Sequence, residues 1–132
     1  MRVYQDLVRA VLERGTRKPN RTGVDTISLF NHNYAIDLAD GFPLLTTKAV
    51  SWKNIVVENL WFLSGRTDIA LLRKHGCKFW DPWADEAGEV ASAYGHFWRH
   101  FPVPDGASDQ IRWVLEELER NPNSRRLVVS AW

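Results

Sequence analysis

A carboxylate within an apolar run is the first residue of this sequence that could do chemistry. Glu58 shares a helical face with Ile55 and Phe62, and most of its neighbours in the sequence are apolar. A buried carboxylate is costly unless it is paired or is used to move a proton. Glu58 is therefore a candidate proton-transfer group. The alternative is a structural glutamate that bonds a neighbouring strand or points to solvent.

Three arginines could bind an anion. Arg125 and Arg126 follow a serine and precede an apolar run, and Arg21 lies in a polar loop before Thr22-Gly23. The planar guanidinium fork suits bidentate binding of phosphate or carboxylate. The sequence has neither a P-loop nor a GxGxxG motif, so a bound phosphate would depend on arginines. The alternative for each arginine is a solvated surface charge, and adjacent strand residues point to opposite faces.

Aromatic residues and carboxylates gather in two segments of irregular sequence, residues 80–85 (WDPWAD) and 94–99 (YGHFWR). Flat aromatic side chains can line a pocket for a heterocycle. The chain has 7 tryptophans, of which we expect most in the core and one or two at a site. The alternative is that these loops are packed down by their own aromatic rings.

The sequence offers little support for a nucleophile or a metal site. Cys77 is the only cysteine and follows Gly76 at an expected helix end, where the helix dipole disfavours a thiolate. We therefore predict a buried small residue there. The histidines lack metal-ligand spacing, and no Ser-His-Asp arrangement is evident. No metal site is predicted, and no disulfide within the chain is possible.

The elements that must position these residues are helices mixed with strands. Apolar periodicity and capping residues predict helices over residues 3–14, 51–64, 67–75 and 108–120. Strand patterns cover residues 26–30, 33–38 and 127–132. The last strand lacks alternation, so it is expected to be buried on both faces, and the chain stops within it. Residues 78–106 are expected to be irregular, as long functional connections often are.

The composition fits one soluble domain over residues 1–132. The chain is 45% hydrophobic and 25% charged, with a net charge of +1, so no overall basic field indicates nucleic acid or a membrane surface. No apolar run is long enough to span a membrane, and the N-terminus lacks the apolar region of a signal peptide. We expect a cytoplasmic α/β protein with a mixed sheet and helices.

Together these segments resemble the thymidylate synthase family. The matching motifs run along the whole chain and comprise residues 21–23, 25–30, 40–48, 58–65, 80–85, 94–99 and 123–126. They correspond to the N-terminal half of the family's chain. The resemblance implies a thymidylate synthase-like fold, truncated at its C-terminal side. It also implies conversion of dUMP to dTMP, with 5,10-methylenetetrahydrofolate as one-carbon donor and reductant and with no metal.

The resemblance implies roles for five residues at the nucleotide. Arg21 would contact the dUMP phosphate. Arg125 and Arg126 would reach the phosphate of the other subunit's dUMP, so that a homodimer is needed. Glu58 would organise waters and protons around the pyrimidine, and Tyr94 would lie near the pyrimidine C5 and the nucleophile.

The resemblance also implies a folate site. Trp80 and Trp83 would line the pocket for the folate ring, with Trp80 close enough to belong to the catalytic residues. Lys48 would lie near the glutamate tail of the folate. Ser51 occupies a folate-binding position at which the family often has a histidine, so the histidine contact would be lost.

The family's nucleophile, a cysteine in a Pro-Cys-His motif, is not among the 132 residues. The chain is therefore expected to be inactive alone, whether it is a fragment, a natural truncation or half of a split enzyme. Two other functions stay open. One is a pyrimidine-nucleotide hydroxymethylase of the same superfamily, in which water rather than hydride traps the methylene intermediate. The other is a non-catalytic module for dimerisation or nucleotide binding.

Overall fold

The computed structural model describes residues 2–131, which fall into two compact units, Met1–Val50 and Ser51–Trp132. The first unit contains helix α1 (Arg2–Arg14), strands β1 (Thr16–Lys18) and β2 (Thr26–Ser28), and the 3-10 helix η1 (Leu38–Asp40). The second contains α2 (Trp52–Ser64), α3 (Ala70–Lys74), the 3-10 helix η2 (Asp81–Trp83), α4 (Tyr94–Arg99), β3 (Phe101–Val103), β4 (Gly106–Ser108) and α5 (Gln110–Arg120). The predicted mixture of α and β structure is confirmed, and the single domain stays a prediction.

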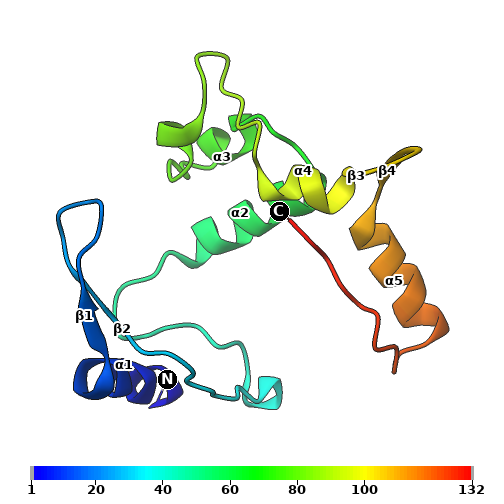
Figure 1. Cartoon of the computed structure of the whole chain (residues 1–132). Helices are drawn as coiled ribbons and strands as arrows, with labels where there is room; N and C mark the ends of the chain where they lie inside the picture. Colours follow the sequence, from blue (N-terminus) through cyan, green and yellow to red (C-terminus); the bar gives the residue numbers. More distant parts are fainter. Residues whose placement is uncertain (1, 132) are drawn as a thin grey trace. The chain divides into compact units, whose positions relative to one another are not determined.

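In the first unit, β1 and β2 form an antiparallel hairpin beside α1 (Figure 1). Helix and hairpin approach closely at Gly15, where an added Cβ would lie 2.5 Å from the side chain of Ile27. Strand β1 was not predicted, because its three residues are polar and show no apolar alternation. The predicted strand over residues 33–38 is wrong, since those residues form no strand in the structure.

The second unit is built around Trp61, whose side chain is completely buried. The indole N–H of Trp61 donates a 2.7 Å hydrogen bond to the backbone carbonyl of Asp68. This bond satisfies the only polar group of the ring and ties α2 to the start of α3. The core around it consists of Val57, Trp61, Ile69, Leu72, Cys77, Val90 and Ala93.

The capping residues of α2 agree with the prediction. The Ser51 hydroxyl accepts a 3.3 Å hydrogen bond from the N–H of Asn54. Gly65 ends the helix with φ 71°, a left-handed conformation that glycine adopts without strain. Short-range sequence signals were sufficient here because both caps act within one turn of the helix.

Two other helices begin later than predicted. The helix expected from Thr67 to His75 is only Ala70–Lys74, because the carboxylate of Asp68 accepts from the Ala70 N–H at 3.1 Å. The helix expected from Ser108 begins at Gln110, because the Asp109 carboxylate caps the Arg112 N–H at 3.0 Å. At α5 an aspartate thus provides the cap that the Ser108 hydroxyl was expected to provide, whereas the residue before α3, Ile69, makes no side-chain cap.

The segment over residues 78–106 is more regular than predicted. It contains η2, α4 and β3, and β3 pairs with β4 as an antiparallel hairpin in which Phe101 lies opposite Ser108. These elements are short, with three to six residues each. Such lengths give too few residues for a hydrophobic period to be recognised.

The predicted buried strand over residues 127–132 is also wrong where the structure describes it. Residues 127–131 form no strand, and the side chains of Val128 and Val129 are 64% and 38% exposed. Trp132 lies outside the described residues. The segment runs from the end of α5 back towards α4 (Figure 1). A β-branched sequence favours a strand only where a partner strand is present, and no strand of the described chain pairs with it.

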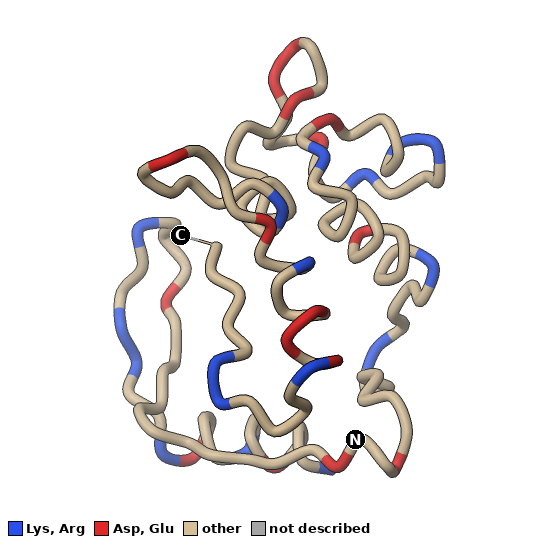
Figure 2. Tube along the Cα trace, turned by 90° about the vertical axis from the view of Figure 1, so that its right-hand side faces the viewer, with Lys and Arg blue, Asp and Glu red and all other residues tan. Residues whose placement is uncertain are grey.

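Charged residues are dispersed along the chain. Figure 2 shows lysines and arginines interspersed with aspartates and glutamates over the described trace, and the net charge is +1. Among residues 2–131, no helix combines the length and apolar character needed to span a membrane.

Gly95 allows α4 to lie directly against α2. A Cβ at this position would meet the carbonyl oxygen of Phe62 at 2.3 Å and its Cα at 2.7 Å. We predict that Gly95→Ala destabilises the chain by about 1–3 kcal/mol, because backbone atoms of α2 cannot move aside as a side chain would. Urea unfolding followed by tryptophan fluorescence measures this change.

Ala91→Val is the matched control for Gly95→Ala, because Ala91 is exposed four residues earlier. It should change stability by no more than about 0.5 kcal/mol. Equal stability of the Gly95→Ala and Ala91→Val proteins would show that the close contact between α2 and α4 does not exist.

Candidate active site

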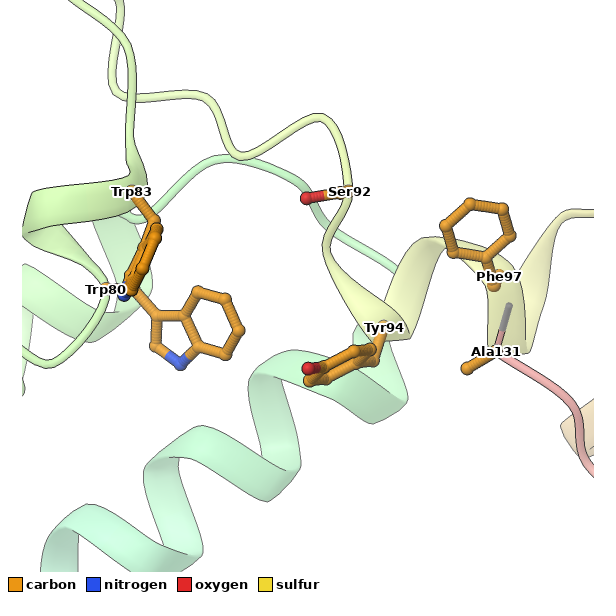
Figure 3. A pocket seen from close by; sticks show the side chains of 6 residues that line it. All are labelled: Trp80, Trp83, Ser92, Tyr94, Phe97 and Ala131. Atoms are coloured by element: carbon orange, nitrogen blue, oxygen red, sulfur yellow. The ribbon is translucent and has the colours of Figure 1, made fainter. Parts of the chain in front are cut away.

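The second unit has an open recess of about 520 Å³ with aromatic walls. Its lining consists of Trp80, Trp83, Ser92, Tyr94, Phe97 and Ala131. Figure 3 shows the two tryptophans on one side and Phe97 with Ala131 on the other, with Tyr94 between them. Trp83 is 72% exposed and Tyr94 is 49% exposed. We call this the aromatic recess, and its size and walls suit a flat ring system.

The rings of the aromatic recess are held by one another and by α2. Phe62 of α2 contacts Trp80 edge-on at 5.8 Å between ring centroids and Tyr94 at 5.7 Å. Trp80 and Tyr94 contact each other at 5.9 Å and 83°. Edge-to-face contacts of this kind are worth about 0.5–1.5 kcal/mol each beyond burial. The sequence places these residues far apart, and their contact with a single helix face brings them together.

Glu58 reaches the aromatic recess through Trp80. Its Oε1 accepts a 2.7 Å hydrogen bond from the Trp80 Nε1–H, and the glutamate is half-buried. The indole nitrogen can only donate, so this bond fixes the orientation of the ring. The carboxylate has further lone pairs that can accept from a water or a ligand. The structural and the chemical interpretations of Glu58 are therefore compatible.

The paired arginines line a separate, polar recess of about 490 Å³. Its lining comprises Asn121, Asn123, Ser124, Arg125 and Arg126. Both arginines are exposed, and the turn before them is stabilised by hydrogen bonds of 2.9 Å from the Ser124 N–H to the Asn121 carbonyl and 3.3 Å from the Arg126 N–H to the Ser124 hydroxyl. A recess with two guanidinium groups suits a phosphate-class anion. We call it the arginine recess.

Glu117 of α5 supports the arginine recess and was not singled out from the sequence. Its side chain is 7% exposed, although Arg120, with which it forms an ion pair, is largely exposed. Hydrogen bonds from the Ser124 hydroxyl and from Arg120 hold the pKa of the Glu117 carboxyl below its usual range. No local pattern distinguishes Glu117 from Glu116 and Glu119 on the same helix, because its partner Ser124 lies in the turn that follows α5.

The remaining predicted site residues have other surroundings. Arg21 and Lys48 are exposed residues of the first unit, and their part in the site stays a prediction. Ser51 caps α2, and its contact with folate stays a prediction as well. Cys77 is completely buried, in agreement with its predicted structural character. Within residues 2–131, no three His, Cys, Asp or Glu side chains are grouped so as to hold a metal ion.

The lowered pKa of Glu117 makes stability depend on pH. A carboxyl whose pKa falls on folding contributes stability above its ordinary pKa of 4.5 and loses it as the pH falls through the folded value. We predict that Glu117→Gln lowers the urea midpoint most above about pH 5 and progressively less in more acidic solution. Midpoints at about pH 6.5 and about pH 3 measure the difference.

Glu119→Gln, an exposed change on the same helix, is the control for Glu117→Gln. Its midpoint difference from the wild type should be small at both pH values. A Glu117→Gln difference that is constant over this pH range would contradict the stabilising contact between Glu117, Ser124 and Arg120.

A known protein family matches both units of this chain. The family described as thymidylate synthase matches residues 2–132, which is nearly the entire chain. The match spans both units, and it includes the residues of the aromatic recess, those of the arginine recess, and Glu58. The chain belongs to the thymidylate synthase family.

Proposed function

We propose that the protein containing this chain converts dUMP to dTMP, with 5,10-methylenetetrahydrofolate as one-carbon donor and reductant. Membership of the family supports a thymidylate synthase-type, methyl-transferring function in general. The observation that carries the specific proposal is the hydrogen bond between Trp80 and Glu58. It places a group able to move protons beside an aromatic recess suited to a ring.

The aromatic recess is proposed to receive the folate ring. Trp80 and Trp83 present indole faces and edges on one side, and Tyr94 is half-exposed between the walls (Figure 3). Stacking on such rings orients a heterocycle without demanding a particular hydrogen-bond pattern. Lys48 and Ser51 are proposed to contact the folate outside the ring, as the family resemblance implies.

Glu58 is proposed to hold and transfer protons at the pyrimidine, with ordered water as the connecting group. Its bond to the Trp80 indole fixes the carboxylate at the edge of the aromatic recess. A positioned carboxylate contributes about 10²–10⁴-fold to a proton-transfer step. Tyr94 is proposed to act on the same side, near the pyrimidine C5.

The arginine recess is proposed to bind the phosphate of dUMP. Arg125 and Arg126 would serve the nucleotide of a second copy in a homodimer, and Arg21 would bind the phosphate of its own subunit. The support is the chemistry of the recess, which combines two guanidinium groups with hydroxyl and amide donors.

Cys77 is not the proposed nucleophile. Its side chain lies in the core with Trp61 and Leu72 and is 0% exposed. Because it is the only cysteine of the sequence, the thiol of the reaction would come from a different segment of polypeptide. The same observation favours a second candidate, a non-catalytic module that binds nucleotide or dimerises. Formation of dihydrofolate by the whole enzyme distinguishes the two.

We predict that Glu58→Gln lowers kcat of the whole enzyme by about 10²–10⁴-fold while the KM for folate changes by less than about threefold. The amide oxygen can still accept from Trp80, so the aromatic recess is preserved and only the proton-transfer group is lost. Dihydrofolate formation, followed by its absorbance, measures both constants. Glu116→Gln, an exposed change on α5, is the control. An unaltered kcat for Glu58→Gln would remove Glu58 from the chemistry.

Removal of an arginine tests the phosphate site. We predict that Arg126→Ala weakens dUMP binding by about 10–100-fold, since charge-assisted hydrogen bonds are worth about 1.5–3 kcal/mol. Binding of deoxyuridine, which lacks the phosphate, should be unchanged, and calorimetric titration measures both ligands. Arg112→Ala provides the control, because Arg112 pairs with Glu116 on the exposed side of α5. Equal losses for dUMP and deoxyuridine would contradict a phosphate contact.

A further inference from the structure

The chain after α5 is fastened to that helix at two points. At Ser124 the backbone N–H donates a 2.9 Å hydrogen bond to the carbonyl of Asn121 at the end of α5, and the Ser124 hydroxyl lies near enough to the Glu117 carboxyl to lower its pKa. At Ser130 the backbone N–H donates to Gln110 Oε1 at 2.8 Å, and the backbone carbonyl accepts from Gln110 Nε2 at 2.7 Å. We call residues 124–130 the return segment. Its arginines lie near the first point, and the aromatic recess lies near the second.

The two fastening side chains share one face of α5. Gln110 and Glu117 are seven residues apart, which is close to two helical turns and about 10 Å along the axis. The return segment could span roughly 20 Å if fully extended. The segment is therefore longer than the stretch of helix between those two residues, and Val128 near its middle is 64% exposed. The course of the return segment is therefore determined by the contacts at its two ends.

Gln110 also holds α4. Its Nε2 donates a second hydrogen bond, 2.8 Å long, to the backbone carbonyl of Phe97. One primary amide thus uses two N–H donors and its oxygen on partners from two other segments. The group is partly buried, so each unmatched partner would be costly. A carboxylate could not donate to the two carbonyls, and an aliphatic side chain could form none of the three bonds.

The residues joined by Gln110 form one wall of the aromatic recess. Phe97 lines the recess itself, and Ala131, which lines it beside Phe97, directly follows Ser130 (Figure 3). In the opposite wall, Trp80 is held independently by Glu58 and by aromatic contacts with Trp61 and Phe62 of α2, and Trp83 follows it in η2. The width of the recess is therefore set by where Gln110 fixes the Phe97 and Ala131 side.

We propose that Gln110 is a positioning residue that sets the width of the aromatic recess and thereby its affinity for a ring ligand. It acts through Phe97 and Ser130 and contacts no substrate. The identity of the ring as a folate rests on the proposed function, whereas the positioning of the wall does not. The arginine recess should depend on Gln110 much less, because Ser124 has its own anchors in Asn121 and Glu117.

Gln110→Leu removes the three hydrogen bonds at nearly constant volume. We expect dihydrofolate to bind about tenfold more weakly per folded molecule, measured by tryptophan fluorescence at saturating dUMP. The affinity for dUMP itself should change by less than about threefold. In the protein without ligand, the amide of Ser130 should exchange at least about tenfold faster, and that of Ser124 should not. Gln5→Leu, the same change at an exposed position of α1, is the control.

Gln110→Glu tests positioning against a general loss of structure. Near neutral pH its carboxylate should bind dihydrofolate as weakly as Gln110→Leu does, because it faces two carbonyl oxygens. In acid the protonated carboxyl can donate one hydrogen bond, so its affinity should recover towards the wild type. Gln110→Leu should show no such recovery.

Three results would overturn the proposal. The first is a folded Gln110→Leu protein whose affinity for dihydrofolate is unchanged. The second is a Gln110→Leu protein that loses as much affinity for dUMP as for dihydrofolate. The third is unchanged exchange at Ser130. If the wild-type protein binds no dihydrofolate, the proposed function fails, and the exchange at Ser130 still decides whether Gln110 positions the wall.

Discussion

The hydrogen bond from the Trp80 indole to the Glu58 carboxylate is the interaction on which the candidate site depends. It joins the carboxylate of Glu58 on α2, the proposed proton-transfer group, to the ring of Trp80, which lines the aromatic recess. Hydrogen bonds to charged groups are worth about 1.5–3 kcal/mol, which is enough to fix the rotamers of both side chains. The helix that carries Glu58 is itself held by the buried Trp61, so the core and the site share one helix.

The second unit is arranged so that α2 and α5 each organise one side of the site. Helix α2 holds Trp80, one side of the aromatic recess, through Glu58 and Phe62. Helix α5 holds the return segment through Gln110 and Glu117, and with it both the arginines and the opposite wall. Two recesses with different chemistry thus depend on one short amphipathic helix.

The sequence predicted the features that depend on local residues. The bounds of α2 follow from Ser51 and Gly65, and Glu58 stood out because its neighbours are apolar. Features without an apolar pattern were missed, including β1, whose three residues are polar, and Gln110, which looks like any helix glutamine. The apolar run after Arg126 predicted a buried strand, yet side-chain hydrogen bonds and not a neighbouring strand hold residues 127–131. The family motifs indicated the candidate residues, but only the structure shows that the arginines and the tryptophans line separate recesses.

A crystal structure of the whole enzyme with dUMP and dihydrofolate tests the central claim most directly. We predict that the folate ring lies against Trp80 and Trp83 in the aromatic recess and that the Trp80 indole is still hydrogen-bonded to Glu58. We also predict that Arg125 and Arg126 contact the dUMP phosphate. A folate ring bound away from these tryptophans, or a Glu58 side chain with no access to the pyrimidine through water, would contradict this claim.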